Sequence, residues 1–487
     1  MIFITEEPFK EWLPPASTCG CGTPKKGKYC VEKWEIFLAK KGEKKMKRFL
    51  CSLLASALGL SLFAGCSGGT PPQAPAAPSS EPAASSQAAP SSSQASEEAP
   101  ALSGEITVMV PDWAVPSDEM LDAFTEQTGV EVIMSVVGWD DIRNKISIAA
   151  SGGAAAADVV EVDWSWVGEF HSADWLEPLD VSEEDIAEMP SIQSFMVDGQ
   201  VLALPYANDF RIAYYNTEHF EKAGITEAPE TWNDVYSALK NIKEKGIVEY
   251  PYSMPMNADE SATTSLIWMA LAQGGKAFND DRTLNKDAVL TALQFVNRTV
   301  EEGLVDPANK TASGMDAYRK LTAGEASFIV GPTSFVSRVN DEKESQVVGK
   351  IQPILLPGAD GPSPNTFALP EGVGVTKFSK NKDAAKAFVK WFNSPETQVQ
   401  LNQVQNAMPT RTSVLQQLID NGKLQNTGAL LEESKRIMSP FPGGVPDYYA
   451  EMSNAIYNAV NTMVLGNQTP EEAFDAMNAK ITELAGK

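Results

Sequence analysis

The chain has 487 residues, of which 43% are hydrophobic and 21% are charged, so it is long enough to form more than one domain with a buried core. Its 64 Asp and Glu outnumber its 39 Lys and Arg and give a formal charge of -25. This balance excludes proteins that wrap nucleic acid, because neutralising phosphates requires clustered basic side chains. With two His and five Cys, histidine-rich metal sites and dense disulfide scaffolds are excluded as well.

The N-terminal residues have the pattern of a leader. Residues 46–65 combine a basic start, a short apolar run and small residues at the end of that run, which is typical of a secretory signal peptide. The run is shorter than the roughly 20 apolar residues of a membrane-spanning helix. Residues 1–45 are interpreted as an upstream extension from a misplaced start, since the spacing of Cys19, Cys21 and Cys30 matches no common zinc motif.

The end of the apolar run, Leu62-Phe-Ala-Gly-Cys66, resembles the lipobox of bacterial lipoproteins. The resemblance implies that Cys66 is the first mature residue and carries the lipid anchor. Residues 66–103 continue with mostly Ser, Ala and Pro, a composition that favours a disordered tether. We therefore expect a location at the extracellular face of the cytoplasmic membrane, or facing the periplasm if the host has two membranes. The length of the tether favours a single-membrane host.

Alternating strands and helices follow the tether. Residues 104–110, 130–137 and 157–162 read as strands, and Ser117 caps a helix between the first two. A strand–helix–strand unit predicts a parallel sheet covered by helices.

The C-terminal half keeps this pattern. We predict a strand at 326–330, a helix at 382–392, a new helix after the cap Ser394, and a last helix opened by a capping box at Thr469. An α/β region of this length is too large for one comfortable core, so we expect two lobes.

Several segments in this order resemble blocks of the bacterial extracellular solute-binding proteins of ABC importers, in the large family that includes sugar-binding lipoproteins. These segments lie at residues 158–180, 198–235, 324–332, 379–385 and 470–474. The resemblance implies a periplasmic-binding-protein-like α/β fold. Its two lobes each have a mostly parallel sheet flanked by helices, and hinge strands join them near residues 206–211 and 369–374. It places the N-lobe at 104–208 plus 372–425, and the C-lobe with the terminal helices at 209–371 plus 426–487.

Candidate ligand-binding residues follow from a rule for open α/β sheets, whose ligands lie at the carboxyl ends of the strands. Trp113 follows the first strand, Trp139 follows the second, and Asp163 and Trp164 follow the third. Aromatic rings and carboxylates together suit the apolar faces and hydroxyls of a sugar. Ordinary packing inside the lobe is the alternative for each Trp, and we assign Trp166 and Trp175 to the core for that reason.

The resemblance adds further candidates. Asp209 lies in the crossing segment, and Arg211 either contacts the solute or pairs with Asp209. Trp268 and Tyr448 are additional aromatic candidates, with core packing slightly favoured for Trp268. Thr333 stands where many sugar-binding relatives carry a Trp, which removes one stacking platform and argues against a maltodextrin-like ligand.

The predicted function is capture of a carbohydrate (a sugar, oligosaccharide or polyol) and its delivery to the permease subunits of an ABC transporter. We expect a monomeric, non-enzymatic protein with no cofactor, no metal site and no nucleic-acid partner. A polyamine or other small polar solute is the first alternative, and three or more unpaired carboxylates in the cleft would favour such a cation. A surface glycan-cleaving enzyme using Asp163 and Asp209 is the second alternative.

Overall fold

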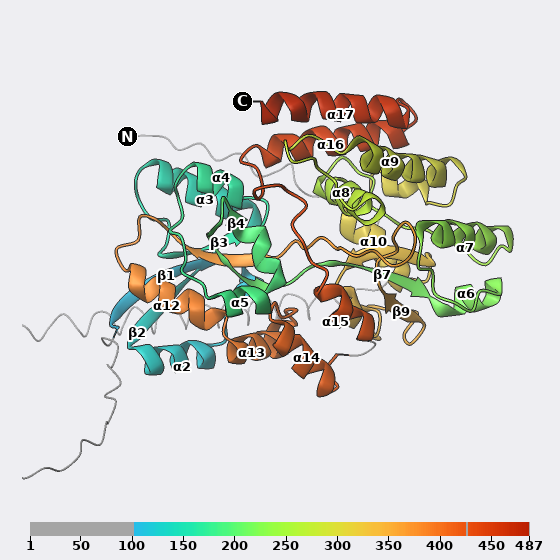
Figure 1. Cartoon of the computed structure of the whole chain (residues 1–487). Helices are drawn as coiled ribbons and strands as arrows, with labels where there is room; N and C mark the ends of the chain where they lie inside the picture. Colours follow the sequence, from blue (N-terminus) through green and yellow to red (C-terminus); the bar gives the residue numbers. More distant parts are fainter. Residues whose placement is uncertain (1–101, 425–426, 487) are drawn as a thin grey trace, which may run out of the picture. The chain divides into compact units, whose positions relative to one another are not determined.

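The computed structural model describes residues 102–424 and 427–486 (Figure 1). The predicted upstream extension, the signal peptide, the lipidated Cys66 and the tether up to residue 101 lie outside these ranges. Within the ranges, no helix is both long enough and apolar enough to cross a membrane.

The first half is built on a mixed five-stranded sheet of order β2-β1-β3-β10-β6. β1 pairs in parallel with β2 and β3, while β10 runs antiparallel to both β3 and β6. A short hairpin of β4 and β5 lies outside this sheet. The strands are β1 (Gly104–Val110), β2 (Val130–Val136), β3 (Val159–Asp163), β4 (Met196–Val197), β5 (Gln200–Val201), β6 (Leu204–Ala207) and β10 (Glu371–Val375).

Helices cover both faces of this sheet. Met120 and Phe124 of α2 and Phe388 of α12 pack on one face, and Ile142 of α3 and Phe170 of α4 belong to the core on the other. The elements of this half are η1 (Asp112–Ala114), α2 (Asp118–Thr128), α3 (Trp139–Ser151), α4 (Val167–Ser172), α5 (Glu183–Glu188), η2 (Pro190–Phe195), α12 (Lys382–Phe392) and α13 (Pro395–Gln405).

The second half contains a three-stranded sheet of order β8-β7-β9, in which both pairings are antiparallel. The parallel pairing that we expected is therefore found among β2, β1 and β3 of the first half, and not among these three strands. The reason is that β7 enters directly from β6 as a crossing strand and runs against both of its neighbours. The strands are β7 (Arg211–Asn216), β8 (Phe328–Pro332) and β9 (Ile351–Ile354).

Two helical groups complete the second half. α16 and α17 pack on α8 and α9, which Figure 1 shows as the red and yellow-green helices. The elements are α6 (Thr217–Ala223), α7 (Trp232–Glu244), α8 (Glu260–Gly274), α9 (Lys286–Glu301), η3 (Pro307–Lys310), α10 (Gly314–Thr322), α11 (Phe335–Arg338), α14 (Thr412–Asp420), α15 (Gly428–Ser434), α16 (Tyr449–Val464) and α17 (Pro470–Ala485).

Extended segments cross between the two sheets side by side. Phe210 and Ala368 form an antiparallel bridge, the backbone N–H of Arg211 donates to the carbonyl of Phe367 at 3.0 Å, and that of Leu369 donates to Asp209 at 2.7 Å. These segments coincide with the crossing strands expected from the family resemblance. The exact lobe bounds remain a proposal.

One packing contact moves the proposed boundary. Val414 and Leu418 of α14 belong to the same core cluster as Ile212 and Tyr214 of β7. Residues 412–424, which we placed in the N-lobe, thus pack with the second sheet, because α14 directs its apolar side toward β7. We therefore propose that the N-lobe ends near residue 411.

The predicted helix ends match the observed caps. Ser117 accepts the N–H of Met120, and Thr469 forms the full capping box with Glu472 at the start of α17. Replacing Thr469 with Ala removes the side-chain acceptor for an N–H that has no partner inside the helix. We expect a loss of about 1 kcal/mol in the free energy of unfolding, measured by urea denaturation. Thr469→Ser retains the hydroxyl and serves as the control, and equal losses in both variants would contradict a capping role.

Candidate functional site

Three tryptophans meet at the carboxyl ends of the parallel strands. The ring of Trp139 lies 5.7 Å from that of Trp113 and 4.8 Å from that of Trp166, measured between centroids. We call these three residues the tryptophan array. Trp113 is 45% exposed, while Trp139 and Trp166 are half-buried. The array thus ends in an indole that is open to solvent, and it includes Trp166, which we had assigned to the core.

A group of carboxyl side chains lies beside the array. Glu371 of β10 lies opposite Asp163 of β3 in the backbone pairing of the two strands. Glu161 points to the same face of the sheet as Asp163, because residues two apart along a strand share a face. The indole N–H of Trp113 donates to Glu371 at 2.8 Å. The hydroxyl of Tyr206 donates to Glu371 at 2.9 Å, and its oxygen also lies 3.2 Å from a carboxyl oxygen of Glu161. Tyr206 therefore connects two acids that are 165 and 45 positions away from it along the chain.

The electrostatics of this group favour protonated carboxyls. The pKa of Asp163 is raised to about 7, mainly by loss of hydration on burial; the hydrogen bonds from Ser165 oppose this rise, and the nearby charges of Glu371 and Glu260 add to it. Burial, followed by the charge of Glu371, raises the pKa of Glu161 well above its ordinary value. Burial also raises the pKa of Glu371.

The second half contributes to the same region. Trp164 is only 4% exposed, because Tyr449 lies 4.9 Å away and Phe367 and Phe441 pack on its other sides. The hydroxyl of Tyr449 donates to Glu260, at the first residue of α8. Trp164 is thus an enclosed packing residue in this structure, whereas Glu260 is exposed to solvent.

Asp209 lies on the crossing segment and is held from two sides. One Nη of Arg211 lies 2.9 Å from each carboxylate oxygen, and the backbone N–H of Thr333 lies 3.3 Å from Oδ1. The side chain of Arg211 is 8% exposed and that of Asp209 is 39% exposed. Arg211 therefore pairs with Asp209, as our alternative stated, and Thr333 is a fully buried part of the support whose hydroxyl donates to the Asn208 carbonyl.

Two predicted residues lie apart from this group. Trp268 is 1% exposed and stacks on Trp232 in the core of the second half, so we leave it out of the proposed site. Tyr448 precedes α16 and packs against the core, and its neighbour Tyr449 makes the contact with Trp164 and Glu260.

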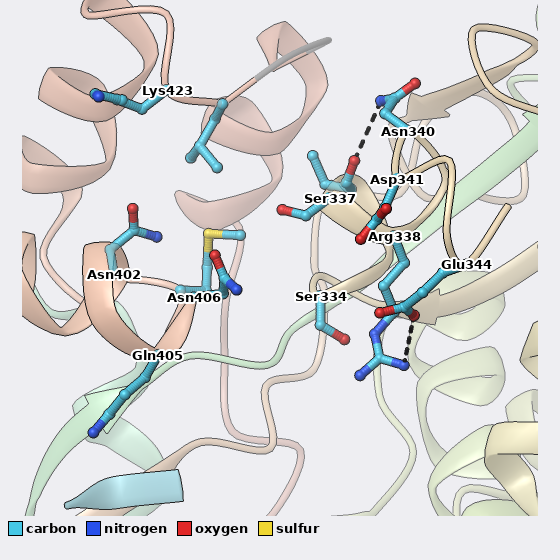
Figure 2. A pocket seen from close by; sticks show the side chains of 13 residues that line it. Ser334, Ser337, Arg338, Asn340, Asp341, Glu344, Asn402, Gln405, Asn406 and Lys423 are labelled. Carbon is cyan, nitrogen blue, oxygen red and sulfur yellow. Dashed lines mark hydrogen bonds and ion pairs between the residues drawn. The ribbon is translucent and has the colours of Figure 1, made fainter.

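A polar pocket of about 540 Å³ adjoins the crossing segment (Figure 2). Figure 2 shows the side chains of Asn402, Gln405, Asn406 and Lys423 on one side. Ser334, Ser337, Arg338, Asn340, Asp341 and Glu344 lie on the other. Ser334 directly follows Thr333, and the carbonyl of Met408 accepts the N–H of Asn208 at 2.9 Å. The sequence did not predict this pocket, because its two walls come from segments that are more than fifty residues apart.

The described residues contain no group of three or more His, Cys, Asp or Glu side chains arranged to hold a metal ion. Both elements of the site, rings and carboxyls, suit a neutral or cationic organic solute. Glu161, Glu260 and Glu371 were not among the predicted residues.

Comparisons with known proteins agree with this architecture. The family model described as bacterial extracellular solute-binding protein matches residues 111–399. A binding protein of Brucella abortus is 23% identical over 79% of this chain and 94% of its own length. A probable amino-acid ABC transporter periplasmic-binding protein of Sinorhizobium fredii is 25% identical over 74% of this chain and 83% of its own length. Among solved structures, maltose-bound MalE3 of T. maritima superposes with a TM-score of 0.64 at 22% identity, covering 78% of this chain and all of the other.

Proposed function

Because the chain belongs to the bacterial extracellular solute-binding protein family, and so acts outside the cytoplasm, we propose that it captures a carbohydrate and delivers it to the permease of an ABC transporter. The carbohydrate is a sugar, an oligosaccharide or a polyol. Relatives and family are binding proteins and not enzymes, which supports capture without turnover.

The observation that carries this proposal is the open indole of Trp113 fixed beside a carboxyl group. Its ring is 45% exposed and its N–H is held by Glu371, so the ring has one orientation before a ligand arrives. A sugar offers an apolar C–H face to stack on such a ring and hydroxyls for the neighbouring carboxyl oxygens. Fixing the ring beforehand lowers the entropy lost on binding.

The proposed capture step uses both halves of the molecule. The tryptophan array, Asp163 and Glu371 belong to the first half, Glu260 to the second half, and Asp209 to the crossing segment. A solute that contacts both halves stabilises the arrangement in which they approach one another, since a ligand shifts an equilibrium only by its differential affinity. The closed arrangement would then be the form that the permease recognises.

Replacing Trp113 with Ala tests the platform. The variant loses ring stacking and its exposed contact area, so we expect its affinity for the bound carbohydrate to fall by about tenfold or more, in line with about 1–2 kcal/mol for such a contact. The ligand is first found by a thermal-shift screen of mono- and oligosaccharides and polyols, because binding raises the melting temperature by mass action. Calorimetric titration then gives the two affinities.

The matched control is Trp175→Ala. Trp175 lies in the same half and packs on Phe170 at 5.4 Å, away from the array. We expect this variant to lose stability but to keep its affinity. If no carbohydrate or polyol raises the melting temperature of the parent protein, or if the purified protein cleaves a glycan, the proposed function is wrong.

A further inference from the structure

Four carboxyl side chains of the site have no basic partner among the residues that the structure describes. They are Glu161, Asp163, Glu260 and Glu371, and none of them takes part in a salt bridge. Their hydrogen-bond donors are the hydroxyls of tyrosines and serines, the indole of Trp113 and the backbone N–H of Ser165. These four carboxyls exceed the minimum of three unpaired carboxylates that favours a cationic ligand.

Two basic groups near the site are already paired. Arg211 binds Asp209, and Arg143 of α3 binds Glu169 of α4 next to the array. Neither guanidinium is therefore available to offset the four carboxyls. The four carboxyls can therefore become ionised only with a cation that comes from outside the described chain.

Asp163 provides a second observation that points to a ligand. Its side chain is nine-tenths buried, and Oδ1 accepts both the N–H of Ser165, at 2.9 Å, and its hydroxyl. Oδ2 accepts no hydrogen bond from any described residue. Oδ2 is not among the enclosed side-chain oxygens that lack a partner in the described residues, so a donor from outside the chain can reach it.

The tryptophan array suits the same kind of ligand. The face of an indole attracts a cation more strongly than do the other aromatic side chains, and neighbouring carboxylates add to that attraction. The exposed ring of Trp113 is hydrogen-bonded to Glu371, which places a ring face and an acid side by side.

From the unpaired acids, the open Asp163 oxygen and the array, we infer that the solute carries a protonated nitrogen, as an aminated sugar does. This inference rests on the proposed carbohydrate binding and narrows its substrate class. The ammonium group lies against Glu371 and Asp163, and the sugar ring stacks on Trp113. Binding of the cation stabilises the ionised carboxylates, so protons leave the site for the buffer as the solute binds.

Calorimetric titrations of the purified protein test this with three matched probes: D-glucosamine, N-acetyl-D-glucosamine and D-glucose. Their β-1,4-linked disaccharides provide the same comparison for a longer ligand. We expect the free amine to bind about tenfold or more tightly than the acetylated and neutral forms. Titrations near pH 7 in two buffers of different ionisation heat are expected to show proton release for the amine alone.

A pair of variants locates the effect. Glu371→Gln is expected to reduce the preference for the amine over the neutral sugar to about twofold or less. Glu183→Gln removes one negative charge from the exposed start of α5 and is expected to leave the preference unchanged. If neutral sugars bind as tightly as the amine, this inference is overturned and the proposed function stands. If no sugar of either kind binds, both are overturned.

Discussion

Replacing Asp209 with Asn is expected to lower the free energy of unfolding by about 3 kcal/mol, because it leaves the guanidinium of Arg211 charged and buried without its counter-ion. The side chain of Arg211 is 8% exposed, and its contacts to both oxygens of Asp209 are 2.9 Å long. The amide of Asn keeps the size of the side chain and one acceptor for the Thr333 N–H. The loss therefore reports the missing charge.

A surface pair gives the matched control for this experiment. Asp280 contacts Lys276 at 3.2 Å, and its side chain is 92% exposed. Asp280→Asn is expected to cost less than about 1 kcal/mol, because water screens the exposed pair. Urea denaturation measures both variants, and Arg211→Met combined with Asp209→Asn is expected to recover part of the loss. Equal costs at the two sites would contradict a buried, structurally required ion pair on the crossing segment.

The fold could be read from the sequence where local signals are strong. The strand at 104–110, the helix at 382–392 and the capping box at Thr469 match the structure, since period-two alternation, a one-sided apolar stripe and cap side chains are encoded locally. The antiparallel second sheet could not be read in this way. Which strand pairs with β7 depends on residues more than a hundred positions away.

Sequence reasoning reached residues of the proposed site mainly where the strand-end rule applies. It selected Trp113, Trp139 and Asp163, which the structure brings to one edge of the first sheet. Glu371 reaches the same edge by antiparallel pairing, which no local pattern reveals. Trp166, which we assign to the core, packs partly against it, and its ring also lies close to that of Trp139.

Trp164 shows what the strand-end rule leaves out. The rule placed it at the correct edge, but three aromatic residues from later segments enclose it and leave 4% of it exposed. Whether a strand-end ring is open or covered depends on the C-terminal segment, which folds back over the site. The position of a residue in a strand thus predicts where a side chain lies better than it predicts whether a ligand can reach it.

Asp163 is expected to make the stability of the protein depend on pH. Burial, as the largest cause, raises its pKa in the folded state from 3.8 to about 7. Between these pH values the folded protein holds a proton that the unfolded chain has released. The contribution of Asp163 to the free energy of unfolding therefore falls as the pH rises from about 4 to about 7, and it is constant above that range. At about 1.4 kcal/mol for each pH unit, the loss between about pH 4.5 and pH 7 amounts to about 3 kcal/mol.

Asp163→Asn removes this titration and keeps an oxygen that accepts the hydrogen bonds of Ser165. We therefore expect the variant to gain about 3 kcal/mol relative to the parent protein when urea denaturation at about pH 7.5 is compared with that at about pH 4.5. Asp180→Asn, at an exposed position, is the control and should follow the parent at both values. A constant difference between Asp163→Asn and the parent would show that Asp163 is ionised across this range. It would then bind its solute without exchanging a proton, and the coupling between capture and proton release that the carboxyl group implies would be lost.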